Sequence, residues 1–407
     1  MLINRSNRMA GVNYAIRGPI ADKANELELQ GNKIIKLNIG NPGVFGFNTD
    51  ESLLKAMREN LLGLEGGQSY SHSKGVADVR ERIAEYHIKK GAQNVSSNDI
   101  FIGNGASELI TASMQALLNP GDEVLVPAPD YPLWTASVNF SGGKAVHYLC
   151  KEDDGWNPDV ADMEAKITKK TRAIVVINPN NPTGANYSPK ILKEIVALAE
   201  KHNLLLFADE IYDRILYDGE VHHSVAEFAG MHTCFTFNGI SKTHLACGFR
   251  GGWLVVSGDK SGLGDYLEGL TTLLSMRLCS NVPAQFACKA ALEQDSQMAK
   301  HIVPGGRLYE QNTLATNLLN DIDGISCVKA KGALYLFPKI DTKKFNITND
   351  QQFVLDFLVA KKVLLINGTG FNWTHPDHFR VVFLPEVKVL EDAVGRLKKF
   401  LSTYRQK

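Results

Sequence analysis

Between residues 97 and 260 the sequence alternates short apolar runs with longer amphipathic stretches, and this alternation restricts the fold more than any other feature. Several runs, such as residues 173–177 (AIVVI) and 204–208 (LLLFA), are apolar at every position. Strands in a parallel sheet have this pattern, because helices cover the sheet on both faces. The sequence therefore predicts an α/β fold with a mostly parallel sheet.

The predicted strands of this region span residues 99–103, 123–126, 144–149, 173–178, 204–208, 233–238 and 252–256, with helices that include 107–118 and 189–201. After about residue 290 the pattern changes to a helix near 309–319, strands at 326–330, 333–340, 363–368 and 378–384, and helices over 350–361 and from 388. We therefore expect an N-terminal arm that also forms part of a small domain (1–45), a large domain (46–290) and a smaller α+β C-terminal domain (291–407).

Composition excludes several classes of protein. The 44 Lys and Arg residues balance 44 Asp and Glu residues, which argues against binding to nucleic acid or to anionic lipid. No apolar run approaches the ~18 residues of a membrane span, and the N-terminus lacks the apolar segment of a signal peptide. The six cysteines form no C-x-x-C pair. We expect a cytoplasmic protein with free thiols and no metal site.

A glycine-rich turn follows the first predicted strand of the large domain. Gly105, Ala106 and Ser107 lie where that strand gives way to a helix, and the free N–H groups of a helix start can bind an anion. A plain tight turn is the alternative. A dinucleotide-binding motif is disfavoured, because Glu108 stands where its third glycine is needed.

Polar residues follow the next strands. The segment 177–184 (INPNNPTG) holds Asn181 in a rigid loop, at the strand end where open α/β sheets bind ligands. Asp209 and Glu210 close a strand that is otherwise apolar, with Tyr212 three residues after Asp209. A buried carboxylate needs a cation or a hydrogen-bond donor, although a helix-capping or Mg²⁺-binding acid is also compatible with this position.

Two cations follow the strand at 233–238. Lys242 comes directly after Ser241, and Arg250 lies eight residues further on. A lysine in an apolar pocket can act as an amine nucleophile toward a carbonyl, whereas a solvated loop lysine is the ordinary alternative. Taken together, the four motifs meet the needs of pyridoxal 5′-phosphate (PLP): an amine for its aldehyde, an acid for its ring nitrogen, donors for its phenolic oxygen and a phosphate site.

The chain resembles the fold-type I, class I and II aminotransferases from about residue 10 to its C-terminus, and most of all their alanine-specific, glutamate–pyruvate members. The resemblance rests on long segments: 36–42 (KLNIGNP), 127–134 (PAPDYPLW), 177–185 (INPNNPTGA), 207–213 (FADEIYD), 276–285 (MRLCSNVPAQ), 305–311 (GGRLYEQ), 332–341 (GALYLFPKID) and 400–406 (FLSTYRQ). It implies a PLP-dependent exchange of amino groups between L-alanine/pyruvate and L-glutamate/2-oxoglutarate, by a ping-pong mechanism in a homodimer with shared active sites.

The resemblance also implies residue roles. Lys242 is the catalytic lysine that carries the cofactor, and Asp209 pairs with the ring nitrogen, whose positive charge should lower the pKa of the carboxyl. The remaining cofactor contacts are Tyr131 on the ring, Asn181 and Tyr212 at the phenolic oxygen, and Gly105, Ala106, Ser107, Ser241, Arg250 and the neighbouring subunit's Tyr70 at the phosphate.

Arg380, with Gly40 and Asn181, is implied at the substrate, where the guanidinium clamps the α-carboxylate. A pocket that accepts both alanine and glutamate needs a movable cation for the second carboxylate, since a buried unpaired arginine is costly. We therefore expect Tyr14 and Arg17 to close over the substrate, with Ile39 lining the side-chain pocket.

One segment departs from the family pattern. His244 and Leu245 stand where Tyr and Arg are expected in the most similar members, which bears on substrate preference rather than on cofactor binding. Alternatives are an aminotransferase of other substrate preference, a β-lyase or decarboxylase on the same fold, a regulator with an idle aminotransferase-like domain, and an NAD dehydrogenase.

Overall fold

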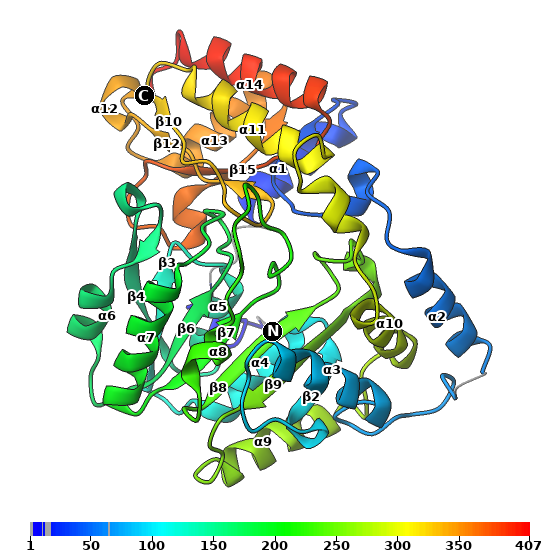
Figure 1. Ribbon diagram of the computed structural model, residues 1–407. Coiled ribbons are helices and arrows are strands. Elements are labelled where there is room, and N and C mark those ends of the chain that lie inside the picture. The colour runs from blue at the N-terminus through cyan, green and yellow to red at the C-terminus, as the bar shows by residue number, and fades with distance from the viewer. Residues whose placement is uncertain (1–2, 10, 13–17, 64–65) are drawn as a thin grey trace.

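A computed structural model describes residues 3–9, 11–12, 18–63 and 66–407 (Figure 1). Its largest sheet has eight strands in the order β2-β9-β8-β7-β6-β3-β4-β5. The strands are β2 Ile100–Asn104, β3 Glu123–Ala128, β4 Lys144–Lys151, β5 Asn157–Pro158, β6 Thr171–Ile177, β7 Leu205–Asp209, β8 Cys234–Gly239 and β9 Gly251–Ser257. All seven strands predicted for this region are present, with small shifts at their ends.

The central strands of this sheet run parallel. The pairs β4/β3, β3/β6, β6/β7 and β7/β8 are parallel, whereas β9 is antiparallel to both β8 and β2, and β5 is antiparallel to β4. The prediction of an α/β fold with a mostly parallel sheet is confirmed.

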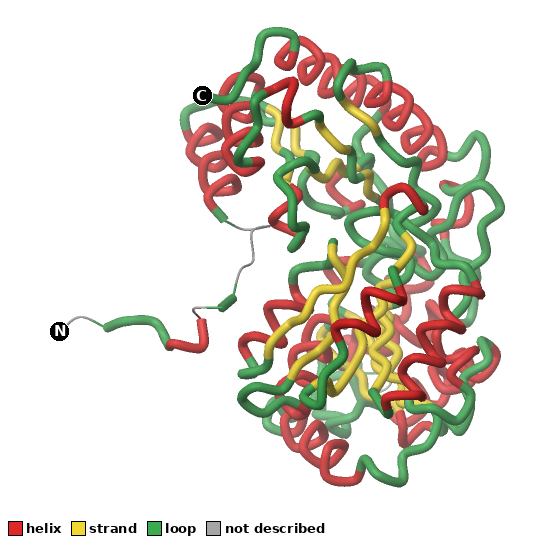
Figure 2. Tube along the Cα trace, turned by 90° about the vertical axis from the view of Figure 1, so that its left-hand side faces the viewer, coloured by secondary structure: helices red, strands yellow, loops and turns green. Residues whose placement is uncertain are grey.

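Both faces of the sheet are covered by helices, as Figure 2 shows for strands drawn in yellow between red helices. On β3, Val124 and Val126 join a buried cluster with α4, α5 and α9, while Leu125 joins another with α6, α7 and α8. This two-sided burial explains why the strand sequences are apolar at consecutive positions. These helices are α4 Ala106–Leu117, α5 Leu133–Phe140, α6 Val160–Lys166, α7 Pro189–His202, α8 Val225–Ala229 and α9 Gly264–Ser275.

The C-terminal part contains helices and short strands. Its helices are α11 Arg307–Asn320, α12 Thr342–Phe345, α13 Asp350–Lys361 and α14 Val387–Leu401, and its strands are β10 Ile325–Ser326, β11 Tyr335–Leu336, β12 Lys339–Ile340, β13 Val363–Leu364, β14 Ile366–Asn367 and β15 Phe379–Val382. The predicted continuous strands at 333–340 and 363–368 are wrong. Each splits in two because its halves have different partners: β11 pairs with β15 but β12 with β10, and β13 pairs with β1 (Ile35–Lys36) but β14 with β15.

The N-terminal segment packs on this C-terminal part. Helix α1 (Pro19–Leu29) buries Ile20, Ala24 and Leu27 in one cluster with Phe353 and Leu358 of α13. Helix α2 (Glu51–Leu61) instead packs with α3 (Ala77–Lys89) and α10 (Val282–Leu292) near the edge of the large sheet. This arrangement supports the proposed division at residues 45 and 290, which stays a prediction.

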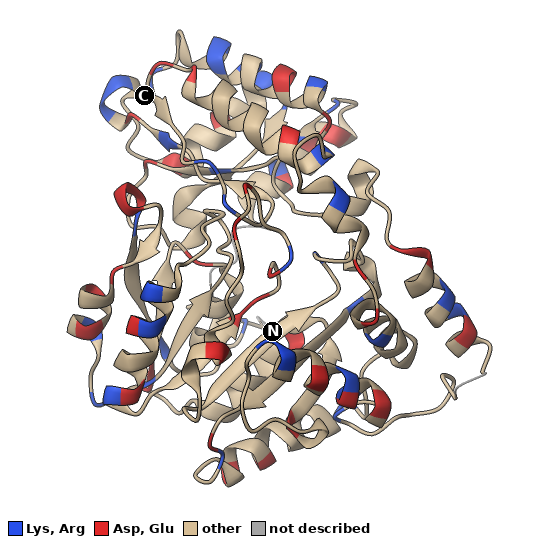
Figure 3. Ribbon diagram, in the orientation of Figure 1, with Lys and Arg blue, Asp and Glu red and all other residues tan. Residues whose placement is uncertain are grey.

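Charges are mixed along the helices: in the view of Figure 3, blue and red segments intersperse rather than gather into one stripe. Within the described residues, none of the helices combines the length and the hydrophobicity required to cross a membrane.

Candidate active site

A cavity of about 290 Å³ lies beyond the carboxyl ends of β6 and β7. Ligands bind to open α/β sheets at such strand ends, because loops from neighbouring strands converge there. The cavity is lined by Ile39, Gly40, Ala106, Ser107, Ile110, Tyr131, Ile177, Asn181, Asp209, Ile211, Tyr212, Ser241, Lys242, Cys247, Arg250, Tyr335 and Arg380. Segments from residue 39 to residue 380 therefore meet at a single site.

Lys242 reaches this cavity from the connection between β8 and β9. Its Nζ donates a hydrogen bond to the carbonyl of Gly40 at 2.5 Å and lies 3.7 Å from the Cys247 sulfur. The first of these contacts joins two segments that are 202 residues apart in the sequence. The amine is thus held among the lining residues, where it can meet a carbonyl group of a bound molecule.

Asp209 ends β7 as a fully buried carboxylate. Trp134 Nε1 donates to its Oδ2 at 3.0 Å, and the backbone N–H of Ile211 faces its Oδ1 at 3.4 Å. Burial raises the pKa of Asp209 to about 6, and among the described residues it forms no ion pair. The expected lowering of this pKa therefore depends on a cation that the chain itself does not supply. A cationic ring nitrogen in the cavity would fit this unpaired acid.

The start of α4 forms an anion cradle with Arg250. Gly105 has φ +82°, and a Cβ built on it would lie 2.4 Å from Arg250 Nη2. A Cβ on Gly252 would lie equally close to the backbone nitrogen of Ala106. Arg250 Nη1 also faces Ser241 Oγ at 3.4 Å. Free N–H groups, a hydroxyl and a guanidinium beside a helix start fit a phosphate.

Glu108 has a structural role here. Its Oε2 accepts a hydrogen bond from the Asn104 backbone N–H at 2.7 Å, and its carboxylate lies 2.9 Å from Arg277 Nε. The acid therefore braces the turn through Asn104 and Arg277.

Arg380 lies at the other end of the cavity, on β15. Its Nη1 donates to Asn181 Oδ1 at 2.8 Å, and its Nη2 donates to the Asn38 carbonyl. The guanidinium lies over the rings of Tyr335 and Phe371, at 4.4 and 4.5 Å. Aromatic faces and hydrogen bonds fix its plane, as recognition of a carboxylate by two parallel hydrogen bonds requires.

Tyr335 and Trp134 are site residues to which the sequence analysis gave no role. The hydroxyls of Tyr212 and Tyr335 are 2.7 Å apart, and burial raises the pKa of Tyr212 well above its ordinary value. A Cβ on Gly40 would lie 2.3 Å from the Tyr335 hydroxyl oxygen. Both aromatics lie in segments on which the family resemblance rests, so the resemblance was the signal that could have identified them as site residues. The other lining residues without an assigned role are Ile110, Ile177, Ile211 and Cys247.

Two predicted residues of the described chain do not line the cavity: Tyr70, which is 79% exposed, and Gly105, which lies beside Arg250 at the start of α4. Tyr14 and Arg17 lie outside the described residues. Among the expected lining residues, Ile39 and Gly40 do face the cavity. His244 is buried, and burial followed by the Arg214 charge lowers its pKa to about 4, so it is neutral at pH 7.

Comparisons with known proteins agree along the whole chain. Residues 32–397 match the family described as aminotransferase class I and II. The chain is 55% identical over 404 residues to the glutamate–pyruvate aminotransferase AlaA of Escherichia coli, covering 99% of both chains. It is 50% identical to an alanine aminotransferase of Mycobacterium tuberculosis, covering 99% of this chain and 93% of that one. A crystal structure of an aminotransferase from Escherichia coli superposes with a TM-score of 0.98, at 54% identity and full coverage of both chains.

Proposed function

The chain belongs to the class I and II aminotransferases, and from this premise we propose how its cavity carries out the reaction and on which substrates. The enzyme exchanges amino groups between L-alanine/pyruvate and L-glutamate/2-oxoglutarate in two half-reactions. The observation that carries this function is the convergence of Lys242, Asp209 and Arg380 on one cavity of about 290 Å³. Full-length similarity to enzymes named for glutamate, pyruvate and alanine supports the choice of substrates.

The residues present fit PLP. The cradle formed by Gly105, Ala106, Ser107, Ser241 and Arg250 would hold its phosphate, and the buried, unpaired Asp209 would face its ring nitrogen. Tyr131 would lie against the ring, and Asn181 and Tyr212 would donate hydrogen bonds to its phenolic oxygen.

When bound, PLP withdraws electrons from the α-carbon of an amino acid and so makes the α-proton acidic. Lys242 Nζ would accept that proton from the α-carbon as a general base and deliver it as a general acid to the cofactor carbon that carried the aldehyde, not back to the α-carbon. Its hydrogen bond to the Gly40 carbonyl keeps the amine at one place in the cavity, so little motion is needed between the two transfers.

Arg380 binds the α-carboxylate that all four substrates share. Its guanidinium is already oriented by Asn181 and by the rings of Tyr335 and Phe371, so little ordering is required when the substrate arrives. We propose Gly40 and Ile39 beside the substrate side chain. The closure of Tyr14 and Arg17 over the second carboxylate of glutamate stays a prediction.

We further propose a cytoplasmic homodimer. Large apolar side chains stay exposed on the single chain at two segments, 54–70 and 276–278: Leu54, Leu61, Leu62, Tyr70, Met276 and Leu278. Exposed apolar patches indicate protein interfaces. The second segment leads to Asn281, whose N–H donates to Asn104 Oδ1 at 3.0 Å, so this surface adjoins the phosphate cradle.

Borohydride reduction of the purified, PLP-loaded enzyme tests the cofactor assignment. The label should be found on the peptide that contains Lys242, and label on another lysine would contradict the assignment. An activity matrix of amino donors against 2-oxo acids tests the substrates, with alanine and glutamate expected to be the best donors.

A further inference from the structure

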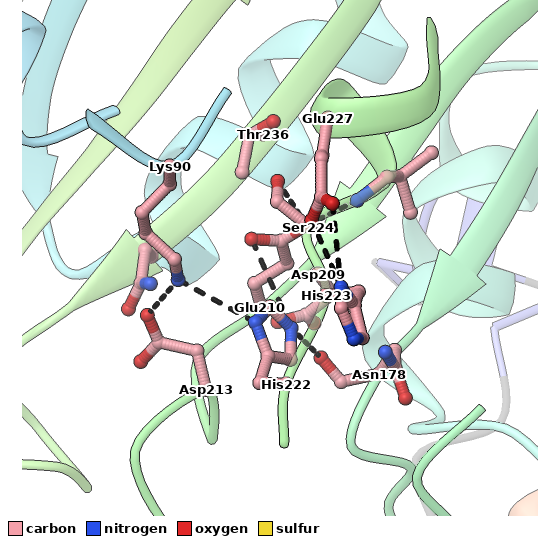
Figure 4. A network of polar contacts seen from close by, with 12 residues as sticks. Lys90, Asn178, Asp209, Glu210, Asp213, His222, His223, Ser224, Glu227 and Thr236 are labelled. Carbon is pink, nitrogen blue, oxygen red and sulfur yellow. Dashed lines mark hydrogen bonds and ion pairs between the residues drawn. The ribbon is translucent and has the colours of Figure 1, made fainter. Parts of the chain in front are cut away.

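A buried polar cluster adjoins the segment that carries Asp209, and Figure 4 shows Lys90 and His222 beside Glu210 and Asp213. Asp209 and Tyr212 line the cavity. Their neighbours Glu210 and Asp213 are buried and instead meet Lys90 and His222, which come from outside the cavity. We call Lys90, Glu210, Asp213 and His222 the Lys90 cluster.

Lys90 fixes the end of the 209–213 segment. Its Nζ lies 2.6 Å from Asp213 Oδ2, and Tyr86 of α3 donates to the same oxygen at 2.9 Å. The Lys90 side chain is only 21% exposed and that of Asp213 only 2%. Burial disfavours both charges, but their attraction outweighs it and lowers the pKa of Asp213 while raising that of Lys90. The pair therefore stays ionised across the pH range in which enzymes work.

His222 extends the contacts of Lys90 to the asparagine loop. Its Nε2 lies 3.2 Å from the carbonyl oxygen of Asn178, which can only accept, so Nε2 carries the proton. Nδ1 then presents a lone pair, and Lys90 Nζ lies 3.5 Å from it. Burial followed by the Lys90 charge lowers the pKa of His222 to about 3, which keeps this arrangement. Asn178 is three residues before Asn181.

Arg214 extends the same contacts to the lysine loop. Its Nε donates to Tyr86 Oη at 3.2 Å, and its Nη1 lies 3.4 Å from His244 Nε2. Since Nε2 must accept, Nδ1 carries the proton and donates to Thr243 Oγ1 at 3.0 Å. His244 is thus the link between Arg214 and the residue next to Lys242.

Glu210 is the second carboxyl group of the Lys90 cluster. Its Oε1 accepts from Ser224 Oγ at 2.8 Å and from the Val225 N–H at 2.9 Å. Its Oε2 lies 4.0 Å from His222 Nε2 and accepts no hydrogen bond within the described part of the chain. Burial raises the pKa of Glu210 to about 7, and the Lys90 charge is the strongest influence in the opposite direction.

We propose that Lys90 is a positioning residue, which holds the three loops carrying Asn181, Asp209 with Tyr212, and Lys242 in register for PLP. The inference rests on the proposed function and extends it to a residue that touches neither cofactor nor substrate. Three loops at adjacent strand ends must agree within a fraction of an ångström. Their polar contacts meet at the buried Lys90–Asp213 pair: Lys90 reaches the asparagine loop through His222, and Asp213 reaches the lysine loop through Tyr86 and Arg214.

The test compares four variants of the full-length chain with wild type: Lys90→Met, Lys90→Arg, the double variant Lys90→Met/Asp213→Leu, and a control, Lys89→Met, at the exposed last residue of α3 next to Lys90. Two quantities are measured after removal of the cofactor: the dissociation constant for added PLP and the urea midpoint of unfolding. Lys90→Met should weaken PLP binding roughly 10- to 100-fold. Lys90→Arg should recover part of this loss, and Lys89→Met should match wild type.

The double variant separates positioning from stability. Removing both charges leaves no unpaired ion in the Lys90–Asp213 pair, and Glu210 can take up a proton because burial raises its pKa. The urea midpoint should therefore return toward wild type, while PLP binding should stay weak. Recovery of both quantities together would overturn the proposal, as would unchanged PLP binding in Lys90→Met. If Lys90→Met alone fails to fold, PLP binding by Lys90→Arg and by the double variant is compared with that of wild type instead. Unchanged PLP binding in these variants would again overturn the proposal. Failure of wild type to bind PLP would instead refute the cofactor assignment.

Discussion

The buried Asp209 carboxylate assists the reaction by pairing with the ring nitrogen, but its burial without a cation destabilises the folded, cofactor-free chain. Its raised pKa of about 6 means that, without a cofactor, the folded chain holds a proton that the unfolded chain has lost. The bound proton contributes stability to the folded chain. This contribution is fully present below the ordinary pKa of 3.8 and is lost as the pH rises through about 6. The shift corresponds to about 3 kcal/mol.

Asp209→Asn should therefore stabilise the cofactor-free chain at pH 8 by up to about 3 kcal/mol relative to wild type, with a smaller gain at pH 5. The same variant should lose roughly 100- to 1000-fold in kcat/KM, because the ring nitrogen has no carboxylate to pair with. Urea unfolding at the two pH values and steady-state kinetics check both parts. A loss in kcat/KM of less than about tenfold would reduce the acid to a structural role.

The variant Arg380→Lys separates the effect of positive charge from the effect of guanidinium geometry on substrate binding. Lysine keeps the positive charge but cannot offer two parallel N–H groups in one plane, nor stack equally well between Tyr335 and Phe371. We expect kcat/KM to fall about 10- to 100-fold for alanine, glutamate and both 2-oxo acids alike. Separate measurement of each half-reaction tests this, since a loss confined to glutamate and 2-oxoglutarate would place Arg380 at the side-chain carboxylate.

At the level of single residues, the sequence could predict those with distinctive chemistry at strand ends. Lys242, Asp209, Asn181 and Arg250 fall into this class, and the structure brings all four to one cavity. Tyr335 could not be assigned a role in this way, because its hydroxyl meets Tyr212 only through the fold, across 123 residues of sequence.

At the level of elements, the turn that leads into α4 requires a glycine at position 105. Gly105→Ala adds a Cβ at φ +82°, 2.4 Å from Arg250 Nη2. Gly121→Ala is a matched control, since Gly121 has φ +89° and nothing within 4 Å of its Cβ position. Both variants should lose unfolding free energy through backbone strain. The loss should be about 1 kcal/mol for Gly121→Ala and roughly 1–3 kcal/mol for Gly105→Ala, because the ψ of 161° at Gly105 lies in a region that almost only glycine adopts.

Only Gly105→Ala should also weaken PLP binding, by tenfold or more, because the new methyl displaces the guanidinium of the phosphate cradle. Titration of each cofactor-free variant with PLP provides the measurement. Equal affinities in the two variants would show that Arg250 can move aside without effect on the phosphate.

Elements of the large sheet could be predicted because two-sided burial leaves a continuous apolar run. The run 173–177 in β6 is an example. The helix that starts after Ser188 could be predicted from its cap, and Ser188 Oγ does accept from the Ile191 N–H at 3.4 Å. The C-terminal strands could not be predicted from apolar runs. Residues 363–367 are buried throughout, yet they pair with β1 and then with β15, and a change of partner leaves no mark on hydrophobicity.

At the level of the whole molecule, the single chain leaves one predicted contact unmade. Tyr70 is 79% exposed and far more accessible than a phosphate ligand should be. It follows the segment 54–62, which carries exposed Leu54, Leu61 and Leu62. A twofold dimer would bury such a surface and could direct Tyr70 into the partner's site.

Mixing two inactive variants tests this arrangement. Tyr70→Asp places a negative charge where the phosphate of the neighbouring site is expected, and Lys242→Ala removes the catalytic amine, so each homodimer should be nearly inactive. A mixed dimer has one site that takes Lys242 from one chain and Tyr70 from the other. Random reassembly of equal amounts makes half of the dimers mixed, so the unfractionated mixture should regain about one quarter of the wild-type activity and purified mixed dimers about one half. The measurement uses two affinity tags to purify the mixed dimers. Inactive mixed dimers would mean that each site is built from a single chain.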